Sequence, residues 1–412
     1  MTMLPTRGRV VLTGTTTRGT RTGTLASAPL VTTPISSPRF AMAKRGLYKG
    51  SATLYPLRRI HIGVRITASS ETSKAAPTFL IMGKKYRNLF EQITSRESLW
   101  AAYKRASLGK RKSSGFLRFK TYDAANIENI RSELERGVYE PGKPREFFVF
   151  EPKARKISAL PFLDRVVQHS LHAALEPIFE KVFLPYSFAC RKGKGVHYGV
   201  KHVQAILRRH KGKKLWCLKL DFKSYFHSID RSLLWKEIEK KVKCQKTLNL
   251  LSLFHPRDGQ GLPIGNLTSQ LLANIYWHKL DRFIVHTLGV KEWARYMDDT
   301  VIFSESKDEL EKIHERLTEF AEKEMRLVWS KWSIRPVSRG VNFLGYRTWT
   351  TYKLIRPDSV RRAKRKIKRY KERAPERLKK FVASWKGHIQ WADCNNLKRK
   401  LLGDTQDAKE NY

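Results

Sequence analysis

The stretch Arg295–Phe303, RYMDDTVIF, decides the fold. Apolar and β-branched residues stand on both sides of Met297-Asp298, which predicts two short strands over 293–304 that meet at this pair. The turn then carries two adjacent carboxylates, Asp298 and Asp299, in apolar surroundings. Burying an ion without a partner is costly, so something positive must compensate these charges. An Asp-Asp pair alone is more often a hydrated turn, and its meaning therefore depends on the rest of the chain.

A third acid, Asp221, closes the apolar stretch Trp216–Asp221, WCLKLD, which predicts another strand. Carboxylate oxygens suit Mg²⁺, which is usually held by one or two carboxylates together with substrate phosphates. Two such ions about 4 Å apart clamp an in-line phosphoryl displacement, and Mn²⁺ is a candidate for the same positions. Asp221, Asp298 and Asp299 therefore predict a two-metal nucleotidyl-transfer site.

The composition points to a polyanionic partner. The 412 residues include 82 Lys and Arg against 37 Asp and Glu, a formal net charge of +45, and 41% of them are apolar, enough for a folded core. Cys190, Cys217, Cys244 and Cys394 lie far apart without zinc-ligand spacing, so we expect neither a disulfide framework nor a zinc site, and a reducing compartment. No apolar run is long enough to predict a membrane span.

Residues 1–81 differ from the rest of the chain. They are rich in Thr, contain a single acid, Glu71, and show no sustained helical or strand period, so we expect a disordered basic extension. One interpretation is an RNA-binding or targeting arm, since the composition also imitates an organellar transit peptide. The other is an untranslated stretch ahead of a start at Met82.

Beyond Met82 the apolar spacing predicts helices over 124–138 and 164–181. Between them, strands over 147–151 and 156–160 are expected to form a basic hairpin. Further along, a glycine-containing loop precedes a long helix predicted over 266–288, with Asn266 as its N-cap. The sequence of the C-terminal part predicts a basic helical tail, in which Arg361–Lys371 has eight Lys and Arg residues in eleven positions.

Tyr296-Met297-Asp298-Asp299 resembles the YxDD signature of reverse transcriptases, and three more motifs stand in that family's order. The segment LDFKSYFHSID (220–230) resembles the strand and turn that carry the first catalytic aspartate. The segment GLPIGNLTSQLLANIYWHKLD (261–281) resembles the loop and helix under the nascent base pair, and FLGY (343–346) resembles the element before the primer grip. Four segments are most similar in sequence to the reverse transcriptases of diversity-generating retroelements, particularly the phage-borne type. They are PIGNLTSQ, MGKKYRNLFEQIT, EFFVFEPKARKISALPF and ASWKGHIQWAD.

The resemblance implies roles for individual residues. Asp221 and Asp298 would ligate both metal ions, with Asp299 beside them and the Phe222 carbonyl as a further ligand. The residues implied in nucleotide binding are Lys153, Arg155, Phe226, Ile264 and Gly265. Arg155 would lie over the triphosphate and base, and Phe226 would be the steric gate against a 2′-hydroxyl. Ile264 stands where retroviral relatives carry glutamine, and Lys331 is a candidate general acid for pyrophosphate.

Two basic segments are expected to contact nucleic acid. They supply Arg191, Lys192 and Lys194 in the loop RKGKG, and Arg361, Arg362, Lys364, Arg365 and Lys366 in the tail. The alternatives are an ordinary surface turn for the loop and a solvated helix face for the tail.

The implied fold is α+β and shaped as a right hand. Residues 82–215 would form N-terminal helices and fingers, 216–350 a palm of antiparallel strands backed by helices, and 351–412 a basic helical thumb. The implied function is RNA-directed DNA polymerisation in bacterial or phage-infected cytoplasm, in which a template-repeat RNA is copied into cDNA from dNTPs with errors at adenine. The RNA/cDNA duplex and an accessory variability determinant protein would be partners. Alternatives are a retron-type or group II intron-type reverse transcriptase, and a basic RNA-binding protein with an inactive polymerase fold.

Overall fold

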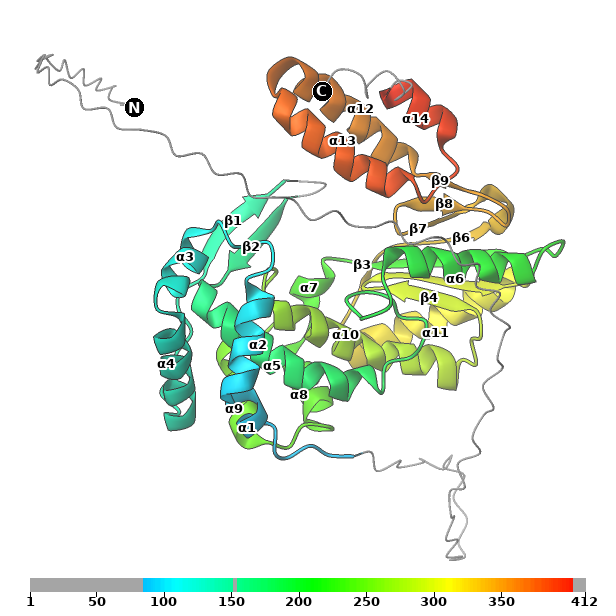
Figure 1. The fold of residues 1–412 in the computed structure, drawn as a ribbon. Coiled ribbons are helices and arrows are strands. Elements are labelled where there is room, and N and C mark those ends of the chain that lie inside the picture. Colours follow the sequence, from blue (N-terminus) through cyan, green and yellow to red (C-terminus); the bar gives the residue numbers. More distant parts are fainter. Residues whose placement is uncertain (1–83, 151–153, 403–412) are drawn as a thin grey trace, which may run out of the picture. The chain divides into compact units, whose positions relative to one another are not determined.

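The computed structural model describes residues 84–150 and 154–402 (Figure 1). The chain divides into two units, residues 1–77 and 78–412, and every described residue belongs to the second. The extension predicted over 1–81 therefore lies outside the described residues. Within the described ranges, no helix is long and apolar enough to cross a membrane.

Helices α1 to α5 build the N-terminal part around aromatic rings. Their bounds are α1 (Phe90–Thr94), α2 (Arg96–Ala106), α3 (Ser114–Thr121), α4 (Asp123–Arg136) and α5 (Phe162–Glu180). Tyr103 and Phe162 both pack against Phe119, with ring centroids 5.2 Å apart in each pair. Helices α4 and α5 confirm the two predicted helices, and α4 ends at Gly137, whose φ of +74° suits glycine.

Strands β1 (Arg145–Val149) and β2 (Arg155–Ala159) confirm the predicted hairpin, shifted by one or two residues. They pair antiparallel, with Arg145 opposite Ala159 and Val149 opposite Arg155. All of β1 is exposed, so no buried face fixes its bounds in the sequence.

A four-stranded antiparallel sheet in the order β4-β5-β3-β6 forms the centre. The strands are β3 (Trp216–Phe222), β4 (Trp293–Tyr296), β5 (Asp299–Ser304) and β6 (Trp329–Pro336). Side chains alternate between two cores, because successive residues of a strand point to opposite faces. Cys217 and Val301 pack with residues of α6 (Val196–Arg209), whereas Leu218 and Ile302 belong to the larger core that includes α10.

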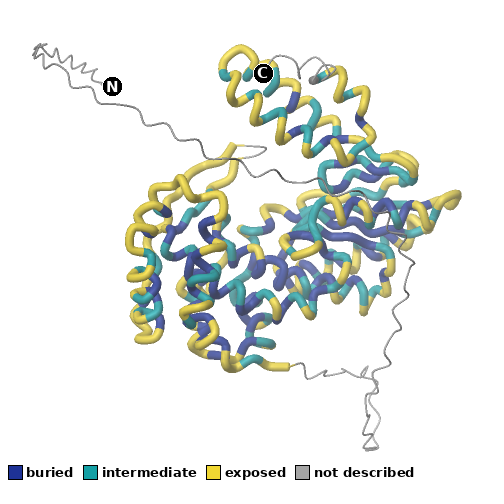
Figure 2. The backbone as a smooth tube through the Cα atoms, in the orientation of Figure 1, coloured by how far each residue is buried: buried dark blue, intermediate teal, exposed yellow. Residues whose placement is uncertain are grey.

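The large core lies under the sheet, among helices α7 (Tyr225–Ser228), α8 (Arg231–Glu239), α9 (Gln245–Phe254), α10 (Leu267–Arg282) and α11 (Lys307–Met325). Buried residues gather in α5, α10 and the sheet (Figure 2). The predicted helix 266–288 is α10 followed by a π-helical turn, Phe283–Thr287. Asn266 is the N-cap residue of α10, as predicted, but its side chain makes no capping hydrogen bond. The Gln168 side chain accepts the Leu267 N–H instead, at 3.2 Å.

The C-terminal part combines a small sheet with three helices of the described chain. Its elements are β7 (Val341–Phe343), β8 (Tyr346–Thr348), β9 (Lys353–Ile355), α12 (Pro357–Arg373), α13 (Pro375–Ile389) and α14 (Asn395–Leu402). A separate core joins Tyr346, Ala363 and Trp385. The basic tail is helical, as predicted, and Ala363 is the buried residue of α12. Helices and antiparallel strands confirm the α+β class, while the right-hand division stays a prediction.

Candidate active site

The three predicted carboxylates lie at neighbouring strand ends. Asp221 is four residues after Cys217 on β3, and Asp299 is two residues before Val301 on β5, so strand alternation places both on the α6 side of the sheet. Asp298 occupies the turn between β4 and β5. The sequence pattern therefore brings all three acids to one end of the sheet.

The turn that carries Asp298 is tight and strained. Tyr296 pairs with Asp299, which leaves Met297 and Asp298 as a two-residue loop and confirms the predicted meeting point of the strands. Met297 has a φ of +53°, a left-handed conformation that costs a non-glycine residue roughly 1–2 kcal/mol. Strain of this kind persists only where surrounding contacts hold the backbone.

Burial and like charge act together on Asp298. Loss of solvent contact, followed by the negative charges of Asp221 and Asp299, raises the pKa of Asp298 from 3.8 to about 6. Asp221 therefore lies near enough for its charge to disfavour ionisation of Asp298. Neighbouring carboxylates repel, so a proton or a cation beside them is favoured.

Asp299 has a partner of its own. Its carboxylate accepts a hydrogen bond from the Lys219 ammonium at 2.5 Å, and Lys219 also donates to the Asn342 carbonyl oxygen at 2.9 Å. Burial raises the pKa of Asp299, and the Lys219 charge opposes that rise. Asp299 is therefore compensated within the protein, unlike the pair Asp221 and Asp298.

The donor set fits a hard divalent cation at Asp221 and Asp298. Carboxylate oxygens are the ligands that Mg²⁺ prefers, and both burial and the neighbouring acids Asp221 and Asp299 raise the pKa of Asp298, which a cation would offset. In residues 84–150 and 154–402, no group of three or more His, Cys, Asp and Glu residues is arranged to hold a metal ion. This result is consistent with the ion pair between Asp299 and Lys219. Asp299 therefore lies beside the candidate metal ligands Asp221 and Asp298 and has its own cation.

The backbone of Phe222, whose carbonyl is the further predicted ligand, is held firmly. Its ring stacks on Trp329 with centroids 3.7 Å apart and meets Trp277 edge-on at 4.8 Å. The β3–β6 register shifts between Asp221 and Phe222. A bulge of this kind re-aims the backbone at a strand end.

Lys331 lies directly opposite Asp221 in the β3–β6 register and is exposed. Cross-strand partners share a face of the sheet, so the candidate general acid stands on the carboxylate side. The neighbouring Ser330 hydroxyl donates to the Asp221 carbonyl oxygen at 2.9 Å.

The predicted nucleotide-binding residues adjoin one another through backbone contacts. The Ser158 N–H of β2 donates to the Ile264 carbonyl oxygen at 2.8 Å, and the Leu262 N–H donates to the Phe226 carbonyl oxygen at 2.7 Å. Arg155 is exposed at the start of β2. The hairpin, the loop 261–265 and Phe226 are thus linked, while Lys153 lies outside the described residues.

Gly265 is required by the hairpin. At its φ of +123°, a Cβ would lie 2.5 Å from the Ser158 carbonyl oxygen. The family resemblance places this loop under the nascent base pair, and in the structure its close neighbour is β2.

Arg191 is the clearest correction among the predicted nucleic-acid contacts. Its side chain is 5% exposed and forms an ion pair with Glu180 at 2.6 Å. It also donates to the carbonyl oxygens of Leu184 and Ser187, at 2.6 and 2.9 Å. A guanidinium so engaged stabilises the loop, so its prediction as a phosphate contact is wrong.

The other cations of this loop differ from Arg191. Lys192 is 86% exposed and lies 3.2 Å from the Glu176 carboxylate. Lys194 donates to the Pro185 carbonyl oxygen at 2.7 Å and lies over the rings of Phe188 and Tyr198. Lys192 is therefore the cation of this loop whose side chain is most open to solvent.

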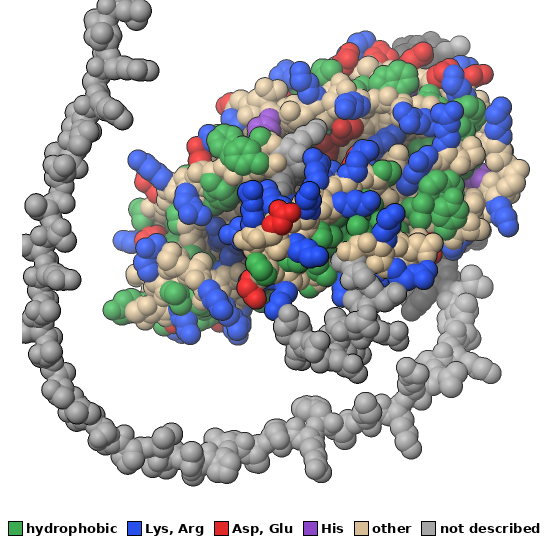
Figure 3. Space-filling model, turned by 90° about the horizontal axis from the view of Figure 1, so that it is seen from above, with side chains coloured by type: hydrophobic (Ala, Val, Ile, Leu, Met, Phe, Trp, Pro, Cys, Tyr) green, Lys and Arg blue, Asp and Glu red, His purple; other side chains and the backbone are tan. Residues whose placement is uncertain are grey.

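Helix α12 presents its cations on the surface. The five residues predicted to contact nucleic acid there, Arg361, Arg362, Lys364, Arg365 and Lys366, are exposed or half-buried. Arg361 pairs with Asp358, and Lys366 lies over the Phe381 ring. Figure 3 views the molecule from above and shows more Lys and Arg than Asp and Glu side chains on this face.

Two cations that pair with acids in or near the sheet, the half-buried Lys219 and the buried Arg295, were not predicted from the sequence. Lys219 stands in the stretch WCLKLD, where its alternation with Cys217 and Asp221 was the available signal. Arg295 is completely buried and pairs with Asp281, which is also completely buried. A charged residue within an apolar strand indicates a buried partner, although the sequence does not say which one.

Comparison with known proteins assigns the family. Residues 143–348, half of the chain, match the family described as reverse transcriptase (RNA-dependent DNA polymerase). The matched segment includes β2, the central sheet and all three carboxylates. The chain therefore belongs to the reverse transcriptase family.

Similar proteins include intron-encoded ones. The group II intron-encoded protein LtrA of Lactococcus lactis subsp. cremoris is 26% identical over 248 residues, 56% of this chain. The protein YkfC of Escherichia coli K12 is 26% identical over 274 residues, 54% of this chain and 71% of its own length. This chain spans only 41% of the length of LtrA.

The solved structures that resemble this chain are more distant. Apo telomerase from Candida tropicalis, truncated from its C-terminal domain, superposes with a TM-score of 0.39 at 12% identity, covering 57% of this chain and 60% of its own. Telomerase from Candida albicans with a fragment of telomeric RNA gives the same TM-score and identity, over 60% of this chain and 52% of its own. These likenesses are too weak to define the fold.

Proposed function

We propose that this chain is an RNA-directed DNA polymerase whose nucleotidyl-transfer site is formed by Asp221 and Asp298, with Asp299 beside them. The observation that carries the proposal is the placement of all three acids at one end of the central sheet, where β3, β5 and the β4–β5 turn meet, inside the segment that matches the reverse transcriptase family. Reverse transcriptase domains generally use divalent metal ions, and this acid pair suits one.

Asp221, Asp298 and the Phe222 carbonyl would hold Mg²⁺, with Mn²⁺ as a substitute. When bound, the two ions supply activation of the attacking hydroxyl and stabilisation of the leaving pyrophosphate. Lys219 opposes the rise that burial causes in the pKa of Asp299, and it holds the Asp299 carboxylate at the edge of the site. The rigid stacking of Phe222 on Trp329 keeps the end of β3 in place.

Other residues would bind the nucleotide and the nucleic acid. Arg155 suits a triphosphate because a guanidinium pairs with phosphate oxygens in a planar fork. Phe226 offers the bulk needed to reject a 2′-hydroxyl. Lys331, opposite Asp221 on the carboxylate side of the sheet, would protonate pyrophosphate. The cations of α12 would track the backbone of the RNA/cDNA duplex.

The domain division follows from these roles. We assign residues 82–215 to N-terminal helices and fingers, 216–350 to a palm, and 351–412 to a basic thumb. The small core around Tyr346 and Trp385 supports a separate C-terminal body, and the central sheet supports the palm.

The finer proposal is a reverse transcriptase of a diversity-generating retroelement. It rests on the sequence similarity of PIGNLTSQ and the other three segments. It implies a template-repeat RNA, an accessory variability determinant protein and nucleotide misincorporation opposite template adenines. The similarity to LtrA is equally compatible with a group II intron-type enzyme. A near-repeat in neighbouring DNA that differs only at adenines would favour the diversity-generating type, and its absence the group II or retron type.

Primer extension on an RNA template with the full chain tests the proposed activity. Asp221→Asn and Asp298→Asn should each abolish Mg²⁺-dependent extension and leave RNA binding near the wild-type value, because each removes a metal ligand and no phosphate-binding cation. The exposed Asp258→Asn is the matched control and should retain activity. Extension by either site variant near the wild-type rate would overturn the metal assignment. RNA binding by the wild type without any extension would instead support an inactive RNA-binding protein.

A further inference from the structure

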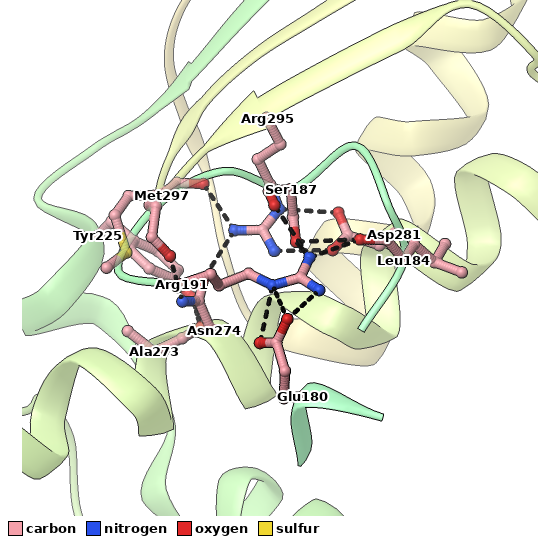
Figure 4. A network of polar contacts seen from close by, with 11 residues as sticks. Glu180, Leu184, Ser187, Arg191, Tyr225, Ala273, Asn274, Asp281, Arg295 and Met297 are labelled. Carbon is pink, nitrogen blue, oxygen red and sulfur yellow. Dashed lines mark hydrogen bonds and ion pairs between the residues drawn. The ribbon is translucent and has the colours of Figure 1, made fainter. Parts of the chain in front are cut away.

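A network of buried polar side chains lies under the Met297-Asp298 turn (Figure 4). Arg295 of β4 and Asp281 of α10 are both completely buried. The Arg295 Nε and Nη2 atoms donate to the two carboxylate oxygens of Asp281 at 2.8 and 2.7 Å. Buried ion pairs contribute little net stability compared with apolar residues of similar volume, so this pair points to a role other than stability.

The rest of the guanidinium reaches the turn. Arg295 Nη1 donates to the Asn274 side-chain oxygen at 3.1 Å and to the Met297 carbonyl oxygen at 3.2 Å. Met297 is the residue with a φ of +53°, and Asp298 follows it. Only a planar fork can bind a carboxylate with one side and two further acceptors with the other.

The partners of Arg295 are themselves fixed. The Asn274 Nδ2 atom donates to the Ala189 carbonyl oxygen at 2.9 Å, which sets the orientation of the amide. The Arg295 guanidinium carbon also lies 5.4 Å from the centre of the Trp277 ring, and Trp277 meets Phe222 edge-on. One buried cation therefore contacts the turn before Asp298 and the ring that supports Phe222.

We propose that Arg295, held by Asp281 and Asn274, is a positioning residue of the nucleotidyl-transfer site: it fixes the Met297 carbonyl and thereby the direction of the Asp298 carboxylate. Asp281 neutralises the Arg295 charge, so the effect on Asp298 is geometric. The catalytic consequence rests on the proposed function, whereas the fixing of the turn does not.

The test replaces the pair and not Arg295 alone, because a single change would leave Asp281 buried without a partner and threaten the fold. The double variant Arg295→Met/Asp281→Leu substitutes apolar side chains of similar length for both charges. Without metal or RNA, amide hydrogen exchange in a peptide covering 296–300 should quicken by about tenfold, while α5 and α10 stay protected. In primer extension, the Mg²⁺ concentration for half-maximal rate should rise by about tenfold at unchanged RNA affinity.

A third substitution separates positioning from general loosening. Glycine adopts a positive φ without strain, so Met297→Gly in the double variant should restore part of the Mg²⁺ affinity. Met297→Ala shortens the same side chain and should restore none.

Wild-type exchange and wild-type Mg²⁺ dependence in the double variant would overturn the proposal. Equal recovery by Met297→Gly and Met297→Ala would overturn the part that concerns the strained turn. A wild-type protein that extends no primer would refute the proposed function, and the exchange comparison would still decide the role of Arg295.

Discussion

Replacing Asp298 by asparagine should stabilise the metal-free protein at alkaline pH, although it should abolish extension. Burial and the charges of Asp221 and Asp299 raise the pKa of Asp298 to about 6. A carboxyl group with a higher pKa in the folded than in the unfolded chain binds more protons when folded. Stability is therefore lost as the pH rises from the unfolded value through the folded one. Asparagine has no charge to bury at any pH, so it avoids this loss.

The magnitude follows from the two pKa values, 3.8 and about 6. At 1.36 kcal/mol per pKa unit, the loss is about 3 kcal/mol at pH 8, about half of that near pH 5, and small near pH 4. The shift in melting temperature is this free energy divided by the unfolding entropy. For a unit of this size, about 3 kcal/mol corresponds to a rise of roughly 4 °C.

Thermal unfolding in EDTA at pH 8 and pH 5 measures this effect, with the exposed Asp258→Asn as control. The Asp298→Asn protein should melt higher than the wild type at pH 8, and the gain should shrink at pH 5. Mg²⁺ at pH 8 should raise the melting temperature of the wild type and not that of the variant, because a ligand stabilises only the state that binds it. A variant that melts no higher at pH 8, or whose gain does not depend on pH, would refute the reasoning.

Three further predictions concern the surroundings of the carboxylates. The first changes four cations of α12 to glutamine: Arg361, Arg362, Lys364 and Arg365. Template binding should weaken, and the slope of log K against log salt should flatten by about 0.7 to 0.9 per lost phosphate contact; an unchanged slope would show that α12 faces something else. The second is that Ile264→Gln lowers misincorporation opposite template adenine by a few-fold, on the order of 1 kcal/mol of recovered discrimination, because glutamine donates a hydrogen bond that isoleucine lacks. Sequencing of cDNA from both proteins decides it, and equal error rates would make Ile264 a packing residue. The third is that Gly265→Ala costs about 2 kcal/mol of stability or more and raises the KM for dNTPs, since its Cβ would meet the Ser158 carbonyl oxygen. Gly212→Ala, which has a positive φ in open space, is the control, and an equal KM in both variants would argue against a link between loop and hairpin.

The strand ends were predictable because strand periodicity and acid placement coincide there. In RYMDDTVIF a run of apolar residues follows Asp299 and predicts a strand buried on both faces, and in the structure these residues alternate between two cores. The β1–β2 hairpin was placed less well for the opposite reason. Phe147 and Phe148 are 39% and 59% exposed, so hydrophobicity marks a strand there without marking its register.

The loop RKGKG shows where composition misleads. A run of cations and glycines looks the same whether its first arginine points outward or inward. Glu180, eleven residues earlier, binds the Arg191 guanidinium together with backbone carbonyl oxygens of the segment between them. Only the turn of the chain after α5 brings these groups together, and single-sequence periodicity does not predict that turn.

The balance of charge across the sheet gives the remaining argument for a cation. On the α10 side, the buried Arg295 is neutralised by Asp281, and on the other side Lys219 neutralises Asp299. Burial and the neighbouring acids Asp221 and Asp299 raise the pKa of Asp298 to about 6, so its carboxylate becomes charged near neutral pH in a half-buried site. Among the described side chains around this sheet, the pairing of Lys219 and Arg295 with other acids leaves the Asp298 carboxylate as the place where an external positive charge stabilises the protein most.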